Sequence, residues 1–193
     1  MHTKGGGHQL IRPSLVEQAM TLADRLGFEN SCLDEVGEFL HVLVGHLQTG
    51  KIAEFGTGCG VSTAWMASAT ELDIYTVDND ASKSTGIKDL FSDVAHVHPI
   101  IGDWEQILAN GPFQFVFVDA KPAKLDGVDR IVDMTDRGGL IVLDDLTPVE
   151  FWPDDWKGRP DRIRDVWLHH PKLAAVEMRT SMKASVILAR RMR

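Results

Sequence analysis

Residues 51–60 combine an acid with closely spaced glycines, a pattern that suits the binding of a small organic cofactor. A short apolar stretch ends in Glu54, and Gly56, Gly58 and Gly60 follow at alternate positions, ahead of a helix-forming run over residues 61–69. Glycines at this spacing let the backbone turn sharply and approach a ligand closely. The helix that follows presents free N–H groups at its first turn. The segment therefore predicts a nucleotide-type cofactor loop.

The register of these glycines separates two cofactor classes. The dinucleotide fingerprint needs a third glycine after two intervening residues, but that place falls on Val61 or on Thr63, depending on which glycine begins the count. A nicotinamide-dependent oxidoreductase is therefore disfavoured. An acid two residues before the first glycine suits a cationic ligand better than a pyrophosphate, which favours S-adenosylmethionine with its sulfonium and ammonium groups.

The elements that must position this loop alternate between strands and helices. Apolar stretches at residues 52–55, 74–77, 97–101, 113–118 and 140–143 predict strands, and residues 113–118 are apolar except for Gln114, as expected of a strand buried on both faces. Helices are expected at residues 14–26, 33–47, 124–135 and 160–169, with a poor helix at residues 80–92. Ser31 and Asp34 have the spacing of a capping box before the second helix.

The last segment of the chain predicts a hairpin, with strands at residues 173–178 and 184–190 joined by a short connector. Together these elements predict an α/β fold with a doubly wound, mostly parallel seven-stranded sheet, preceded by N-terminal helices and closed by an antiparallel hairpin. We expect one domain over residues 1–193, with N-terminal arm and helices at 1–50, a cofactor-binding core at 51–145 and a substrate loop and hairpin at 146–193. Residues 5–7, all glycine, predict a loose arm.

Acids recur at or just beyond the predicted strand ends. In open α/β sheets, ligands bind beyond the carboxyl ends of the strands. A single acid there is usually a helix cap or a turn residue, but acids after all five strands need cationic partners: a sulfonium ligand, a metal ion or lysines. The acids in question are Glu54, Asp78, Asp103, Asp119, Asp144 and Asp145.

With this glycine loop and these acids, the chain resembles the class I S-adenosylmethionine-dependent methyltransferases from about residue 33 to residue 190. More narrowly, it is similar to the cation-dependent O-methyltransferases of the catechol and caffeoyl-CoA type. The resemblance implies that Asp78 accepts hydrogen bonds from both ribose hydroxyls, that Asp103 accepts from the adenine amine, and that Ser62 lies near the methionine carboxylate. The full set of cofactor-binding residues that it implies is Glu54, Gly56, Thr57, Gly58, Gly60, Ser62, Asp78, Asn79, Gly102, Asp103, Trp104 and Asp119.

The same resemblance implies a divalent metal held by Asp119, Asp144 and Asp145, and oxygen ligands suit Mg²⁺, Ca²⁺ or Mn²⁺. The family has asparagine where Asp145 stands, and its catalytic lysine would fall on Pro122. We take Lys121 as the catalytic lysine, acting beside Asp119. Lys124 is the other candidate, and the alternative is that both lysines are solvated turn residues.

The sequence indicates least about the molecule that accepts the methyl group. We expect a small hydroxylated molecule, aromatic or catechol-like; Trp152 and Trp156 either wall such an acceptor or cover the core or a partner chain. Some relatives methylate hydroxylated transfer-RNA uridines, but the formal net charge of −8 disfavours nucleic acid as a partner. A non-catalytic S-adenosylmethionine-binding protein is the remaining alternative.

Composition and targeting signals indicate the cellular location that we expect for the protein. No apolar run reaches the roughly 20 residues that span a bilayer, so no membrane association is expected, and the first residues lack the apolar centre of a secretion signal. Two cysteines, Cys32 and Cys59, form no disulfide framework, which favours a reducing cytoplasm. The resemblance also suggests a homodimer.

Overall fold

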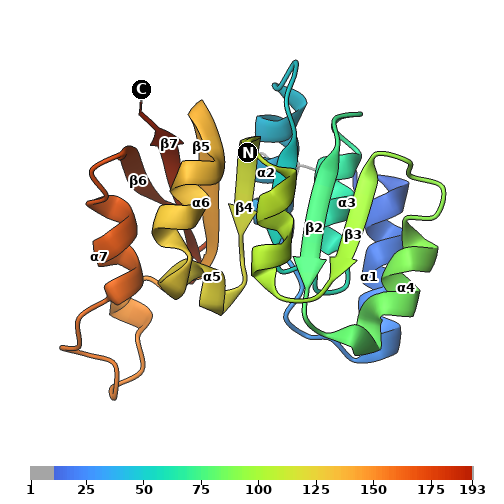
Figure 1. Ribbon diagram of the computed structural model, residues 1–193. Helices are drawn as coiled ribbons and strands as arrows, with labels where there is room; N and C mark the ends of the chain where they lie inside the picture. The colour runs from blue at the N-terminus through green and yellow to red at the C-terminus, as the bar shows by residue number, and fades with distance from the viewer. Residues whose placement is uncertain (1–10, 193) are drawn as a thin grey trace, which may run out of the picture.

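A seven-stranded sheet forms the centre of the computed structural model, which describes residues 11–192 (Figure 1). Its strand order is β3-β2-β1-β4-β5-β7-β6. All pairings from β3 to β5 are parallel, whereas β7 runs antiparallel to both β5 and β6. This confirms the predicted doubly wound sheet with one antiparallel strand. The strands are β1 (Ile52–Phe55), β2 (Ile74–Asp78), β3 (Val97–Ile101), β4 (Phe113–Val118), β5 (Thr135–Leu146), β6 (Leu173–Arg179) and β7 (Ser185–Arg191).

Helices cover both faces of the sheet and bury two apolar clusters (Figure 1). One cluster lies beneath α1 (Ser14–Leu26), α2 (Asp34–Gly45), α3 (Val61–Ala67) and α4 (Ser84–Leu90). The other lies beneath the 3₁₀ segment η2 (Trp104–Asn110) and α5 (Lys121–Asp126), α6 (Val128–Met134) and α7 (Arg162–Leu168). Two short 3₁₀ turns, η1 (Ala81–Lys83) and η3 (Val149–Phe151), complete the elements.

The two-residue alternation of a strand decides which side chains of β1 face which layer. Ile52 belongs to the cluster beneath α1–α4, whereas Ala53 and Phe55 belong to the cluster beneath α5–α7. Glu54 therefore points toward the layer that contains α3. This orientation governs its role at the candidate site.

Three local predictions differ from the structure. The capping box at Ser31 and Asp34 is wrong, because α2 begins after Leu33 without a side-chain cap and Asp34 instead accepts a hydrogen bond from Arg12 Nε at 2.9 Å. The helix expected at residues 124–135 is two helices that meet at Gly127, and the strand expected at 140–143 extends over all of β5. The predicted glycine arm at residues 5–7 lies outside the described residues.

Within residues 11–192, none of the helices combines the length and apolar character needed to cross a bilayer.

Candidate active site

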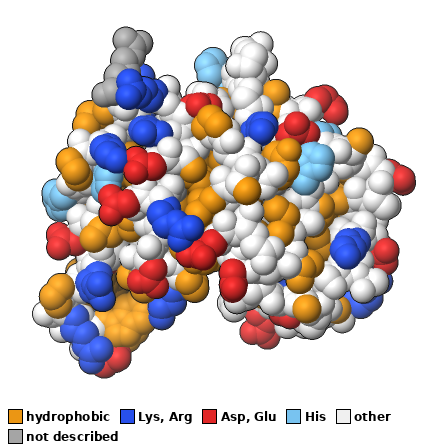
Figure 2. All heavy atoms as spheres, viewed as in Figure 1, with side chains coloured by type: hydrophobic (Ala, Val, Ile, Leu, Met, Phe, Trp, Pro, Cys, Tyr) orange, Lys and Arg blue, Asp and Glu red, His pale blue; other side chains and the backbone are white. Residues whose placement is uncertain are grey.

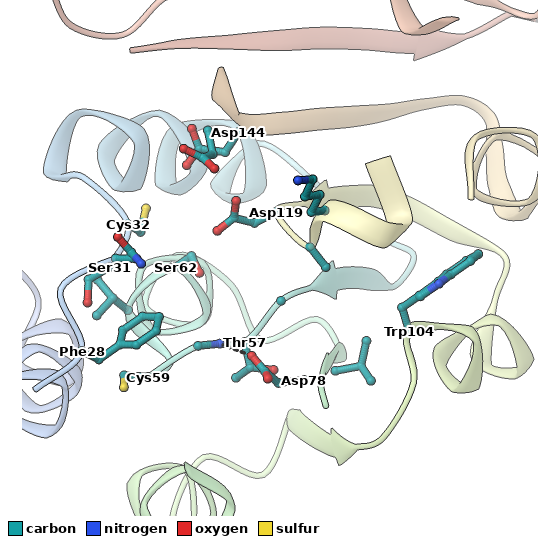
Figure 3. A pocket seen from close by; sticks show the side chains of 18 of the residues that line it. Phe28, Ser31, Cys32, Thr57, Cys59, Ser62, Asp78, Trp104, Asp119 and Asp144 are labelled. Atoms are coloured by element: carbon teal, nitrogen blue, oxygen red, sulfur yellow. Dashed lines mark hydrogen bonds between the residues drawn. The ribbon is translucent and has the colours of Figure 1, made fainter. Parts of the chain in front are cut away.

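An open cavity of about 950 Å³ lies at the carboxyl edge of the parallel strands, where the segments that follow β1 to β4 meet the end of β5 (Figure 3). A volume of this size is typical of small-molecule sites. Most of the predicted site residues line it: Gly56, Thr57, Gly58, Ser62, Asp78, Asn79, Gly102, Asp103, Trp104, Asp119, Lys121, Asp144 and Asp145. The structure thus brings together side chains from five strand ends that are far apart in the sequence.

The glycine loop connects β1 to α3 and forms one wall of the cavity. Gly56, Gly58 and Gly60 all have positive φ angles, of 105°, 55° and 81°. A Cβ atom at Gly56 would lie 3.1 Å from the backbone nitrogen of Ala120, just after β4. Glycine therefore allows the loops that follow two neighbouring strands to touch, which a larger residue would prevent.

Asp78 ends β2 and is fixed against the glycine loop. Its Oδ2 accepts a hydrogen bond from the Gly58 backbone N–H at 2.7 Å, and its Oδ1 accepts one from the Asp80 N–H at 2.9 Å. A carboxylate has about four lone-pair sites, so each oxygen can accept a further donor. The geometry is compatible with the predicted contact to two neighbouring hydroxyl groups.

Glu54 lies behind the glycine loop, outside the set of residues that line the cavity. Its buried carboxyl group accepts hydrogen bonds from the hydroxyls of Ser62 at 2.5 Å, Thr76 at 2.6 Å and Thr63. Burial raises its pKa to about 7, and these three hydrogen bonds oppose the rise. Glu54 therefore ties α3 to the sheet, and its position does not support the predicted direct contact with a cofactor.

Gly60 is likewise absent from the cavity wall. It precedes α3, and a Cβ atom there would lie 2.9 Å from the Phe91 ring. The third glycine of the motif thus serves helix packing.

Asp119 follows β4 and Asp144 lies in the last residues of β5, and the two lie on the same side of the cavity, away from Asp78 (Figure 3). The backbone N–H of Asp119 donates to the Phe55 carbonyl at 2.8 Å, which anchors the end of β4 beside β1. Asp144 is buried. Its burial raises its pKa to about 6, and the negative charge of Asp119 is the second cause of this rise. Asp145 has a φ of 58° where the pairing of β5 with β7 shifts register, and its side chain is exposed. Such irregularities redirect side chains next to functional sites.

The lysine in contact with Asp119 is Lys124. Its Nζ lies 3.1 Å from Asp119 Oδ1, and its side chain is 4% exposed. The view of Lys124 as a solvated turn residue is therefore wrong. Lys121, which we predicted to be catalytic, is exposed and lines the cavity. Its catalytic role stays a prediction.

The three predicted metal ligands do not form a ready metal site. Across residues 11–192, no group of three or more His, Cys, Asp or Glu side chains is arranged to hold a metal ion. Asp119 already has the Lys124 ammonium as its cationic partner. The arrangement of the described residues thus does not fit the predicted site of three carboxylates.

The aromatic residues divide between the cavity and the surface. Trp104 lines the cavity and packs edge-on against Phe55, with the Arg130 guanidinium 5.2 Å from its ring. Trp152 and Trp156 pack against each other outside the cavity lining, and Trp152 Nε1 donates to the Thr147 carbonyl at 2.9 Å. The prediction that this pair walls the acceptor receives no support from their position.

The segment between α1 and α2 also lines the cavity, which the sequence reasoning missed. The Phe28 ring packs over Gly58, where a Cβ atom would lie 3.2 Å from it, and Lys83 Nζ lies 4.5 Å from the ring centroid. Ser31 lines the cavity with its hydroxyl buried and without a partner. No local motif marks this segment as part of a binding site, because helix packing brings it to the loop. The other residues missed are Glu29, Asn30, Cys32, Leu33, Cys59, Val61, Val77, Glu105, Ala120, Pro122, Ser181, Lys183 and Ala184.

Comparisons with known proteins agree with this fold. Residues 53–146 match the sequence profile of a family described as a methyltransferase domain. The catechol O-methyltransferase of Mycobacterium tuberculosis is 30% identical over 125 residues, covering 57% of this chain and 54% of that protein. The chain's match thus spans about half the length of this curated relative.

Solved structures show the same fold over nearly the whole chain. The O-methyltransferase TomG of Streptomyces achromogenes superposes with a TM-score of 0.78 at 19% identity, covering 95% of this chain and 92% of that one. The O-methyltransferase of Bacillus cereus gives a TM-score of 0.75 at 19% identity, covering 94% and 92%. This chain therefore has the fold of these methyltransferase structures. The match of residues 53–146 to the methyltransferase profile agrees with the resemblance predicted from the glycine loop and the acids.

Proposed function

We propose that this protein is an S-adenosylmethionine-dependent O-methyltransferase that acts on a hydroxyl group of a small, aromatic or catechol-like acceptor. The observation that carries the proposal is one cavity that unites the glycine loop, Asp78 and Asp103 with a second group of acids at the carboxyl ends of β4 and β5. The curated relative named above is a catechol O-methyltransferase, and the TomG structure holds S-adenosylmethionine. Both support the same chemistry here.

The cofactor end of the cavity has the groups that such a ligand requires. We assign Asp78 as the acceptor for the ribose hydroxyls and Asp103 as the acceptor for the adenine amine beside Trp104, and all three residues line the cavity. We assign the loop N–H groups and Ser62, which also line the cavity, to the methionine portion. When bound, S-adenosylmethionine supplies an electrophilic methyl group on a positively charged sulfur.

The acceptor end is polar, which suits a hydroxylated molecule. Asp119, Asp144 and Lys121 line it together with Lys183 from the connector between β6 and β7. In the transfer, the acceptor oxygen forms a bond to the methyl carbon, the carbon–sulfur bond breaks, and its electron pair remains on sulfur. The hydroxyl proton passes to a base in the cavity, for which we propose the side chain of Lys121. Holding the oxygen in line with the methyl group supplies much of the rate.

Calorimetry with S-adenosylhomocysteine tests the cofactor assignment. We expect binding to the wild type and a loss of about 100-fold on Asp78→Ala, because two hydrogen bonds to a charged group disappear. Asp89→Ala changes an exposed acid on α4 and is the matched control; its affinity should equal that of the wild type. Equal affinity of Asp78→Ala and wild type would contradict the assignment.

Turnover assays test the acceptor class. We expect methylation of simple catechols by the wild type. Methylation of transfer RNA from a strain lacking the protein, with no product from catechols, would contradict the proposal and favour the nucleic-acid alternative. Binding of the cofactor product without turnover on any acceptor would favour a non-catalytic protein.

A further inference from the structure

The carboxylates at the acceptor end of the cavity have a buried lysine beside them. The carboxylates of Asp119 and Asp144 line the same side of the cavity (Figure 3). Like charges this close need a cation nearby. The ammonium of Lys124 already fills this role at Asp119, at 3.1 Å.

Lys124 is held in this place by its backbone as well as by its side chain. Its N–H donates to the Ala120 carbonyl at 3.1 Å, within the first turn after β4. Its own carbonyl accepts a hydrogen bond at 2.8 Å from Nε1 of Trp167, a fully buried residue of α7. The side chain of Lys124 is almost completely buried, and both its backbone N–H and its carbonyl are hydrogen-bonded. Lys124 therefore has a fixed position beside Asp119.

We propose that Lys124 is the resident cation of this carboxylate cluster, a positioning residue through which the protein transfers the methyl group without a divalent metal ion. The proposal rests on the proposed function and goes beyond it, because it assigns the site's cation to the chain itself. The sequence predicted a metal site of three carboxylates, whereas the structure places the Lys124 ammonium beside one of them, Asp119. The proposal follows from this difference. Lys124 lies outside the cavity lining, so it acts by fixing and neutralising Asp119.

Manganese binding is the measurement that tests this proposal independently of turnover. The protein is stripped with EDTA, desalted and saturated with S-adenosylhomocysteine, and Mn²⁺ is then titrated by calorimetry. We expect no binding tighter than the millimolar range for the wild type. Lys124→Met should bind Mn²⁺ roughly ten-fold or more tightly than the wild type, because two neighbouring carboxylates then lack their cation. Lys88→Met, which removes an exposed lysine on α4, should behave as the wild type does.

A second pair of measurements keeps the test decisive if Lys124→Met fails to fold. In the wild type, turnover on a catechol should be the same in EDTA as in Mg²⁺, within about two-fold. The charge-balanced variant Lys124→Met/Asp119→Asn should fold, as seen by circular dichroism, and should gain no Mn²⁺ affinity.

The proposal is overturned if the wild type binds Mn²⁺ at micromolar concentrations, if EDTA abolishes turnover that Mg²⁺ restores, or if folded Lys124→Met gains no Mn²⁺ affinity. The S-adenosylhomocysteine titration separates this failure from that of the proposed function. Absence of cofactor binding would refute the methyltransferase assignment, whereas cofactor binding with tight Mn²⁺ binding would refute only the role of Lys124.

Discussion

At the scale of single residues, the buried carboxyl group of Glu54 couples stability to pH. Burial raises its pKa to about 7 from an ordinary value of 4.5. The folded protein therefore binds more protons than the unfolded chain between these values, so its stability falls as the pH rises through that window. The full contribution is at most about 3 kcal/mol, and it is lost above pH 7.

We expect the free energy of unfolding of the wild type, measured in urea, to decrease from about pH 5 to about pH 7.5, and the decrease to be smaller in Glu54→Gln. The readout is the slope against pH, because the substitution also changes the hydrogen bonds to Ser62, Thr63 and Thr76. Glu35→Gln, at an exposed site on α2, should keep the wild-type slope. A Glu54→Gln slope equal to that of the wild type would show that this carboxyl group is not the source.

The sequence correctly predicted that most of the acids lie at the cavity. It did not predict which face of the sheet each acid side chain points to. Asp78, Asp103, Asp119, Asp144 and Asp145 all reach the cavity, because the carboxyl ends of parallel strands meet at one edge. Glu54 does not, since alternation along β1 turns it under α3. Lys121 and Lys124 could not be told apart either, because their exposure depends on how α5 packs against Trp167.

At the scale of elements, the start of α3 depends on the fit of Gly60 against α4. Gly60 and Gly158 have nearly equal φ angles of 81° and 79°, so an alanine costs similar backbone strain at both. A Cβ atom at Gly60 would lie 2.9 Å from Phe91, whereas one at Gly158 would meet nothing within 4 Å. The pair of variants therefore separates crowding from backbone strain.

We predict that Gly60→Ala lowers the free energy of unfolding by about 1–3 kcal/mol more than Gly158→Ala does, since crowding adds to the strain common to both. Urea denaturation of the two variants measures the difference. Equal losses of stability would mean that Phe91 moves aside freely, and that the third glycine is needed only for its backbone conformation.

Element types were easier to predict than element ends. Periodicity correctly indicated the long N-terminal helices and the central strands. The cap of α2 was missed because Asp34 has a partner 22 residues earlier, Arg12, which no local pattern reveals. The break between α5 and α6 falls at Gly127, where a Cβ atom would lie 2.8 Å from the Ala123 carbonyl and 2.9 Å from Trp104. That constraint comes from tertiary packing.

At the scale of the whole molecule, the sheet gathers acids at the carboxyl edge of its parallel strands. On the face seen in Figure 2, acidic and basic side chains are interspersed. The strand order explains why residues as distant as Gly56 and Asp144 share one cavity. The segment at residues 28–33 completes the cavity from the N-terminal helices, and the connector between β6 and β7 completes it from the other end of the chain. Neither contribution could be read from the sequence, because both depend on packing between distant elements.

The central claim is that this edge of the sheet holds a positively charged methyl donor. A crystal structure of the protein with S-adenosylhomocysteine tests it most directly. We predict the ribose at Asp78, the adenine between Asp103 and Trp104, and the sulfur facing Asp119 and Asp144. Nucleoside density anywhere else on the molecule, or no density at saturating ligand, would contradict the account.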